Sequence, residues 1–185
     1  MDKKEVLRYL RTYSGIKDEG VLALANRACE DIEKAAQPKT LCRIFDCRVT
    51  DDSVIVGETE FKSKRLATHL SGCKRVIAFG ATLGAEVDRM IRLCQSTDTA
   101  LAMAYQAAGA TLIEEICDEL EEEIKKQQGL KLRPRFSPGY YDLSLDTQKQ
   151  FFELLELTKR CGITLTDKML MIPSKSVTAF IGIED

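Results

Sequence analysis

The pattern of apolar and polar residues predicts two helices near the amino terminus, followed by strands. Residues 2–13 and 19–36 have the spacing of amphipathic helices. The second of these segments carries an apolar stripe formed by Val21, Leu24, Ala25, Ala28 and Ile32. Residues 41–49 alternate imperfectly and residues 54–56 form a short apolar run, so both are predicted strands, separated by a turn-forming Asp-Asp pair.

The rest of the chain continues this mixed pattern. Further helices are predicted at residues 62–70, 84–94, 98–127 and 144–160, and further strands at residues 75–80, 163–166 and 176–183. Residues 129–143 between the last two helices are predicted to be irregular. Ser96 or Thr97 would cap the long helix, whereas Ser144 would cap the following one and Gly162 would end it.

The order of these elements bears on the fold class. Helices gather toward both ends, and strands are interspersed without strict β-α-β alternation. This order predicts an α+β fold in which helices pack on a twisted, largely antiparallel or mixed sheet. With 185 residues, the chain is predicted to form a single domain over residues 1–185.

Composition and charge exclude several classes of function. The chain is 44% hydrophobic and 30% charged with a net charge of −2, so no basic excess indicates nucleic-acid binding. No apolar run approaches the ~20 residues of a membrane span. The first residues lack the apolar stretch of a signal peptide, which predicts a cytoplasmic protein without membrane association.

Cysteine and histidine residues offer little evidence of a metal site. The seven cysteines include no Cys-x-x-Cys pair, and in a reducing cytosol we expect them to be structural. The single histidine, His69, has no second ligand or nucleophile near it in sequence, so we interpret it as a surface or helix-packing residue.

The long predicted helix carries an acidic segment, residues 114–123, with seven acids in ten positions. Four of these acids are expected to face water: Glu115, Asp118, Glu119 and Glu122. Glu114 differs because it lies on the flank of the apolar stripe, in line with Ala107 and Ala110. A carboxylate there could bind an ammonium group or a ribose diol, although small residues serve helix packing equally well.

The segment from Arg133 to Tyr141, with the sequence Arg-Pro-Arg-Phe-Ser-Pro-Gly-Tyr-Tyr, is the least ordinary in the chain. Arg135 offers a planar fork for a carboxylate. Backbone groups near Gly139 could bond a flat heterocycle, and Tyr140 could stack on it. The alternative is an ordered loop whose arginines pair with the acidic helix.

These motifs together resemble the activation domain of cobalamin-dependent methionine synthase. The resemblance rests on Arg135-Phe136-Ser137-Pro138-Gly139-Tyr140, a following helix, Cys161-Gly162-Ile163-Thr164-Leu165-Thr166, and the run from Met169 through Pro173 to Ser174-Lys175-Ser176-Val177. It implies a site for S-adenosylmethionine in which Arg135 meets the donor's carboxylate and Gly139 and Tyr140 line the adenosyl portion. Ser137 and Pro138 belong to the same run, and Glu114 matches the family's helix glutamate.

The resemblance also implies a role. Such a domain presents S-adenosylmethionine to cob(II)alamin on the cobalamin-binding domain of a methionine synthase or related corrinoid protein, with an electron usually supplied by flavodoxin. The cobalamin belongs to the partner, so we assign no catalytic residue here. We expect this chain to act as a free-standing accessory subunit for reductive reactivation.

The chain departs from the longer family members in two respects. It ends at Asp185, whereas they continue with a segment that bears a tyrosine pair near the ligand. Their amino-terminal aspartate has no clear match here, with Asp46 and Asp51 as equal candidates. Both departures predict weak donor binding until a partner completes the site.

Two alternative functions remain open. One is a scaffold for a corrinoid methyltransferase that does not bind S-adenosylmethionine. The other is an independent Rossmann-type methyltransferase, suggested by residues 78–84 after a strand, although this run lacks the Gly-x-Gly spacing. In that run, Gly80 and Gly84 could equally do no more than open a helix.

Overall fold

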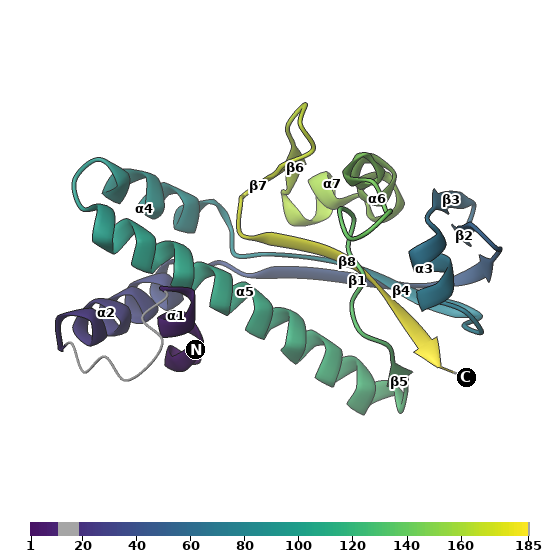
Figure 1. Ribbon diagram of the computed structural model, residues 1–185, viewed down its shortest axis with the longest axis horizontal. Coiled ribbons are helices and arrows are strands. Elements are labelled where there is room, and N and C mark those ends of the chain that lie inside the picture. Colours follow the sequence, from purple (N-terminus) through teal and green to yellow (C-terminus); the bar gives the residue numbers. More distant parts are fainter. Residues whose placement is uncertain (11–18, 185) are drawn as a thin grey trace.

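A six-stranded antiparallel sheet lies at the centre of the protein in the computed structural model, which describes residues 1–10 and 19–184 (Figure 1). The strand order is β3-β2-β1-β4-β8-β5. The strands are β1 (Lys39–Val49), β2 (Ser53–Val56), β3 (Thr59–Lys62), β4 (Arg75–Thr82), β5 (Lys131–Leu132) and β8 (Ser176–Glu184). Every pairing within these described strands is antiparallel, which confirms the predicted α+β class and excludes the parallel sheet of a Rossmann fold.

Strand β4 is central because its sequence can be buried on both faces. It pairs with β1 from Lys39 opposite Thr82 to Asp46 opposite Arg75, and with β8 along its other edge. From Val76 onward every residue of β4 is buried. The continuous apolar run in the sequence therefore reflects a strand that is covered by helices on both sides.

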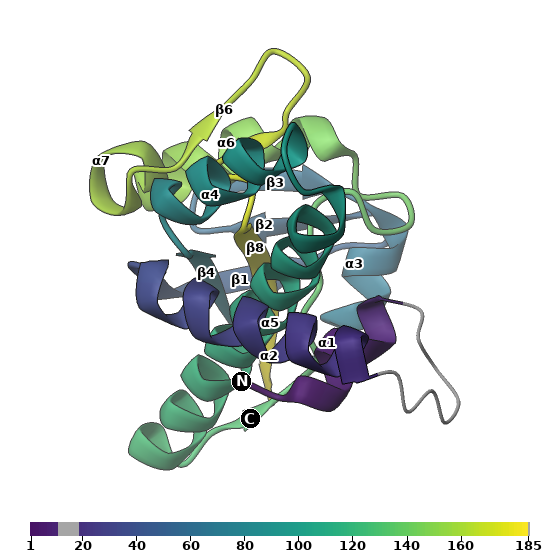
Figure 2. The same ribbon diagram turned by 90° about the vertical axis from the view of Figure 1, so that its left-hand side faces the viewer.

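Four helices cover one face of the sheet: α1 (Lys3–Tyr9), α2 (Glu19–Ala35), α4 (Ala85–Gln95) and α5 (Thr99–Gln128). Figure 2 shows α1 and α2 on this side. On the other side it shows α6 (Gln148–Leu155), α7 (Leu157–Cys161) and the hairpin of β6 (Thr164–Leu165) and β7 (Met171–Ile172). Ile77, Phe79 and Ile181 of the sheet join the core between the sheet and these four helices. The apolar stripe predicted in the second helix faces this core, where Ala25, Ala28 and Ile32 are buried.

The opposite face is covered by α3 (Lys64–His69), α6 (Gln148–Leu155) and α7 (Leu157–Cys161). Phe180 of β8 lies at the centre of this second core, with ring centroids 4.9 Å from Phe61 and 4.7 Å from Phe151. The sheet thus separates two apolar cores, each closed by its own layer of helices.

The predicted helix caps need correction at one position. Neither Ser96 nor Thr97 caps the long helix, because Asp98 accepts a hydrogen bond from the Leu101 backbone N–H at 2.9 Å. Ser96 instead ends α4, and the Thr97 hydroxyl donates to the Leu93 carbonyl. Because Ser96 and Thr97 belong to the end of α4, Asp98 is the residue that caps α5.

The predicted helix over residues 144–160 is interrupted. Ser144 does accept a hydrogen bond from the Asp146 backbone N–H, but it opens a short 3-10 turn (η1, Leu145–Thr147) before α6. Glu156 then adopts a left-handed conformation with φ of 53° and separates α6 from α7. As predicted, Gly162 ends the last helix in a left-handed conformation.

Two further sequence predictions differ from the structure, and three short strands were not predicted. The strand predicted at residues 163–166 is the two-residue β6 (Thr164–Leu165), which pairs with β7 (Met171–Ile172) in a separate hairpin rather than with the main sheet. The strands that were not predicted are β3, β5 and β7. The first predicted helix, residues 2–13, ends at Tyr9, and positions 11–13 lie outside the described residues.

The cysteines and Gly80 have structural explanations. No disulfide joins any of the seven cysteines, all of which lie in the described residues, and Cys29, Cys73, Cys117 and Cys161 are buried. A side chain at Gly80 would meet Leu157 of α7, its Cβ lying 2.6 Å from Cδ2, so Gly80 serves packing rather than nucleotide binding.

Within residues 1–10 and 19–184 no helix has the length and hydropathy to cross a membrane, and no cluster of ligating side chains could hold a metal.

Candidate functional site

The segment from Arg133 to Leu143, which we call the Pro-Gly loop, follows β5 and crosses the edge of β8. Phe136 forms an isolated β-bridge with Phe180, which places the loop beside the sheet. Gly139 has φ of 91°, and its N–H donates to the Leu143 carbonyl at 2.8 Å. Only glycine adopts this conformation readily, so the turn requires the glycine that the sequence provides.

Helix α3 fastens the Pro-Gly loop at both ends of the helix. At its amino end, Asp142 accepts hydrogen bonds from the Ser63 hydroxyl at 2.5 Å and from the Lys64 N–H at 2.8 Å. These bonds, led by the one from Ser63, lower the pKa of Asp142. At its carboxyl end, His69 Nε2 lies 2.8 Å from the Pro134 carbonyl oxygen, and the His69 carbonyl accepts from Arg133.

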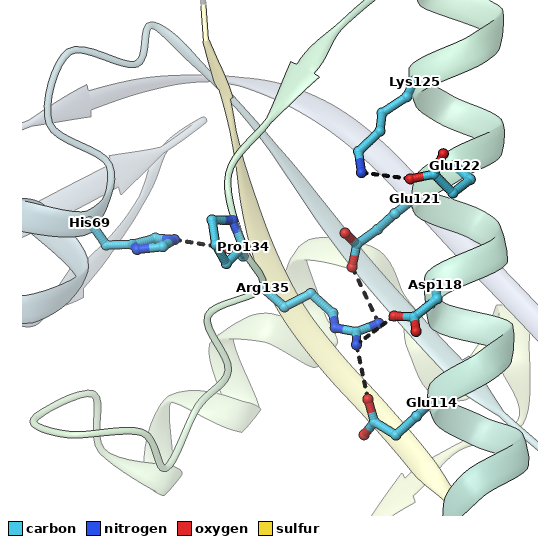
Figure 3. Close-up of polar contacts among 8 residues, drawn as sticks. All are labelled: His69, Glu114, Asp118, Glu121, Glu122, Lys125, Pro134 and Arg135. Atoms are coloured by element: carbon cyan, nitrogen blue, oxygen red, sulfur yellow. Dashed lines mark hydrogen bonds and ion pairs between the residues drawn. The ribbon is translucent and has the colours of Figure 1, made fainter. Parts of the chain in front are cut away.

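The role of His69 was thus only partly predicted from the sequence. Its ring packs on Phe136 with centroids 5.2 Å apart, so it does pack, but against the Pro-Gly loop rather than another helix. Figure 3 shows its contact with Pro134 on the side of the loop away from α5. His69 therefore supports the Pro-Gly loop on the side opposite α5.

On the other side of the loop, Arg135 reaches the acidic face of α5 (Figure 3). Its guanidinium lies 2.9 Å from Glu114, 2.9 Å from Asp118 and 3.2 Å from Glu121. These three acids are spaced four and three residues apart, which places them on one helix face. The alternative interpretation of the loop, in which its arginines pair with the acidic helix, therefore describes the structure at Arg135.

The acids around Arg135 differ in exposure. Asp118 remains 68% exposed, as expected from the helical pattern, but it is paired rather than merely solvated. Glu121, which the sequence did not single out, is only 15% exposed, and its burial raises its pKa although Arg135 acts in the opposite direction. Cys117 lies beneath them, and burial raises its pKa to about 12, so it is an inert thiol at neutral pH.

A cavity of about 610 Å³ opens between the Pro-Gly loop, α5, the β6–β7 hairpin and β8; we call it the loop cavity. Its lining is mainly apolar and includes Leu145, Met169, Met171 and Val177. The polar lining groups come from Glu114, Ser137, Gln148, Thr166, Ser174, Ser176 and Thr178. Few polar groups on an apolar wall are typical of small-molecule sites.

Four of the six predicted ligand-binding residues line the loop cavity: Glu114, Ser137, Pro138 and Tyr140. Tyr140 is 55% exposed, so part of its surface is accessible to a ligand. Gly139 shapes the turn between its neighbours, while Arg135 is held by the acids of α5. The structure thus brings Glu114 to the same cavity as the loop, although they lie more than twenty residues apart in sequence.

The sequence did not predict the contribution of β8 and α6 to this cavity. The Thr178 hydroxyl donates to the Gln148 side-chain oxygen at 3.0 Å, and the Ser176 hydroxyl lies 2.8 Å from that of Thr82. Both are buried polar side chains with satisfied hydrogen bonds. The sequence signal that could have indicated this contribution is the presence of two polar residues, Ser176 and Thr178, in the otherwise apolar last strand.

A second cavity of about 510 Å³ adjoins the first and shares Glu114 and Tyr140 with it; we call it the acidic cavity. Its other lining residues come from α1 and α5 and are Asp2, Glu5, Arg8, Tyr9, Thr111, Glu115 and Asp118. In the part of the chain that the structure describes, neither Asp46 nor Asp51 lines either cavity. The amino-terminal aspartate that lines the acidic cavity together with Glu114 is Asp2.

Comparison with known proteins gives a consistent result. The family model for the vitamin B12-dependent methionine synthase activation domain matches residues 66–185, more than half of the chain. Among solved structures, the crystal structure of the MetH reactivation domain bound to AdoHcy has a TM-score of 0.68 at 18% sequence identity. That superposition covers 98% of this chain and 76% of the other, so the shared fold includes the amino-terminal helices. No curated protein sequence matches the chain.

Proposed function

Because this chain belongs to the family of vitamin B12-dependent methionine synthase activation domains, we propose that it binds S-adenosylmethionine and presents it to cob(II)alamin on a partner. The observation that carries the proposal is the loop cavity, which the Pro-Gly loop and Glu114 form together. Its volume of about 610 Å³ lies within the usual range of roughly 300–1,000 Å³ for small-molecule sites.

The chemistry of the lining residues suits this ligand. S-adenosylmethionine has a flat adenine, a ribose diol, an ammonium and a carboxylate. The adenine finds an apolar wall and the exposed ring of Tyr140, with backbone groups near Gly139 as hydrogen-bond partners. Glu114 supplies a carboxylate for the ammonium or the diol.

Arg135 is the proposed partner of the donor's carboxylate, and here the structure adds a cost. The guanidinium already contacts three carboxylates, so the ligand must compete with Asp118 and Glu121 for it. Displacing the exposed Asp118 costs roughly 0–1 kcal/mol, whereas the pair with the largely buried Glu121 costs more to break. We expect this competition to weaken donor binding to the isolated chain.

The chain's own contribution is to orient the methyl donor. Cobalamin, supplied by the cobalamin-binding domain of a methionine synthase or related corrinoid protein, provides the cobalt chemistry. Holding the donor in a fixed place makes its encounter with the cofactor effectively unimolecular. We further propose flavodoxin as the electron donor. As the compartment we propose the reducing cytoplasm, which suits seven cysteines that form no disulfide.

A scaffold that does not bind S-adenosylmethionine is the second candidate function. The observation in its favour is the ion-pair cluster of Arg135, because an arginine used only to fasten the loop needs no ligand. The two candidates differ in whether the loop cavity takes up the methyl donor.

Calorimetric titration with S-adenosylmethionine, with and without a cobalamin-loaded partner domain, separates these candidates. We expect binding, tighter when the partner is present. Glu114→Gln should weaken it, whereas the matched exposed control Glu119→Gln should not, because Glu119 lines neither the loop cavity nor the acidic cavity. No heat of binding in either titration would reject the activation role and leave the scaffold.

A further inference from the structure

Lys175 lies outside the loop cavity, in a setting that the proposed function does not explain. The chain around it is fixed: the Ser174 N–H and hydroxyl both donate to Asp88 at 2.7 Å, and the Lys175 carbonyl accepts from the Leu83 N–H at 2.9 Å. With the backbone held on both sides, the direction of the lysine side chain is determined.

The aliphatic part of Lys175 packs across α5 at Gly109. A Cβ built on Gly109 would lie 3.1 Å from Cε and 3.3 Å from Cγ of Lys175. Because Gly109 is in the middle of a helix, where glycine is unfavourable by about 1 kcal/mol relative to alanine, its presence needs a packing reason. The close approach of the lysine side chain supplies that reason.

The ammonium group of Lys175 forms no hydrogen bond or ion pair with any residue in the ranges 1–10 and 19–184. Burial lowers its pKa, and Asp88, the nearby carboxylate, acts in the opposite direction without contacting it. By contrast, Arg135 and Arg133 have carboxylate partners. Lys175 is therefore a partly buried cation without a counter-ion among the described residues, a costly arrangement.

Lys175 also lines a cavity of about 350 Å³, which we call the lysine cavity. Its wall is largely apolar, from Leu10, Met103, Ala107 and Ala110, and Gln106 and Tyr9 add an amide and a hydroxyl. The lysine cavity shares no lining residue with the loop cavity. One cation, two neutral hydrogen-bonding groups and an apolar wall suit an anion that carries a small apolar body.

We propose that the lysine cavity is a binding site for a small carboxylate, whose charged group pairs with Lys175 and whose apolar body lies against Met103, Ala107 and Ala110. Because a cavity of about 150 Å³ can hold benzene, a volume of about 350 Å³ has room for a carboxylate with a body of one or two rings. The carboxylate also finds donors in the Gln106 amide and the Tyr9 hydroxyl. This site is independent of the methyl donor.

Titration of the isotope-labelled full chain, followed by the amide signals of Gly109 and Ala110 in NMR spectra, tests this proposal. The probes are benzoate, its neutral counterpart benzamide, and inorganic phosphate at constant ionic strength. We expect benzoate to give saturable shifts at these amides and to bind at least about tenfold more tightly than benzamide or phosphate, since only benzoate combines charge with an apolar body.

Variants then assign the binding to Lys175. Lys175→Met keeps the aliphatic side chain and should lose at least about tenfold in benzoate affinity, whereas Lys159→Met, at an exposed position on α7, should lose none. Gly109→Ala keeps the charge but displaces the lysine side chain, and should also weaken benzoate binding. Equal affinity for benzoate and benzamide, absence of binding, or an unchanged affinity in Lys175→Met would each overturn the proposal.

Discussion

Arg135 was predicted as a ligand-binding residue from its chemistry, but its actual partners depend on the fold. The sequence offers a guanidinium in a rigid loop, and the structure surrounds it with Glu114, Asp118 and Glu121. This cluster preserves a forked donor beside the loop cavity, and it also holds Glu114 at the boundary of the two adjoining cavities. One arginine thus positions a second candidate ligand residue.

Removal of the guanidinium in Arg135→Ala should weaken S-adenosylmethionine binding roughly 10- to 150-fold, the range for hydrogen bonds between charged groups. Calorimetry measures the change, and circular dichroism checks that the variant is folded. Arg160→Ala is the matched control, because among the described residues Arg160 pairs with Glu156 alone, on the exposed surface. Unchanged affinity in Arg135→Ala would remove Arg135 from the site and leave it a fastening role.

At the scale of elements, α3 and the Pro-Gly loop depend on each other. Helix α3 has only six residues, and its first turn receives both its own cap, Ser63, and the carboxylate of Asp142 from the loop. A negative charge at a helix amino terminus stabilises the free N–H groups there. The loop therefore helps to cap the helix that supports it.

The variant Asp142→Asn keeps the shape but loses the charge, so we expect a lower thermal midpoint and weaker donor binding near neutral pH. The folded-state pKa of Asp142 is lowered, mainly by the Ser63 hydroxyl, so its stabilisation is present above the ordinary aspartate pKa. It is lost as the pH falls through the lowered value. Thermal melts should show the difference narrowing in acid, and a difference independent of pH, or one shared by the exposed control Asp167→Asn, would contradict this account.

Helices α2 and α5 are joined by one buried phenol. The Tyr105 hydroxyl donates to Asp31 at 2.7 Å, and burial together with this bond raises the pKa of Tyr105 to about 12. An unfolded tyrosine titrates near pH 10, so this part of the stability is complete below about pH 10 and is lost between about pH 10 and 12.

We therefore predict that the free energy of unfolding of the wild-type protein falls by up to about 2–3 kcal/mol more than that of Tyr105→Phe across this window. Urea titrations at about pH 9 and about pH 11 measure part of the difference. Parallel pH dependence of the two proteins would show that Tyr105 ionises as freely in the folded chain as in the unfolded one.

On the scale of the whole molecule, the two cores share one sheet. Phe180 and Ile181 are adjacent in β8, both fully buried, and they point into opposite cores. Because β4 and β8 contribute to both cores, loss of packing on one side weakens the strands on which the other side depends. From this arrangement we propose that residues 1–185 fold as a single domain.

The pair Phe180→Ala and Ile181→Ala tests that prediction. We expect losses of about 3–5 and 2–5 kcal/mol respectively, from the cavities left in each core. Chemical unfolding should remain one cooperative transition in both variants, with fluorescence and circular dichroism giving the same midpoint. Two separated transitions, each sensitive to one of the two substitutions, would instead identify two independently folding units.

Local patterns in the sequence determined much of this protein. Helical periodicity located α2 and α5, the continuous apolar run located β4, and Pro138 with Gly139 marked an ordered turn. The same run, with the helix and motifs that follow it, was enough to identify the family. These features could be predicted because backbone conformation and burial on one face depend on residues close in the chain.

The tertiary structure decided what depends on distant residues. The break at Glu156 and the separate β6–β7 hairpin arise where packing overrides a local helical or strand preference. The fold places Glu114, Asp118 and Glu121, which lie 14 to 21 residues away in the sequence, around Arg135. It also joins Asp142 to Lys64 across 78 residues and packs Lys175 against Gly109. The sequence supplies the charged residues, but the fold decides which of them meet. It brings Glu114 and Asp118 within 3 Å of Arg135 and leaves Lys175 without a counter-ion among the described residues. The physical reason is that Coulomb energy depends on spatial distance and burial rather than on order along the chain.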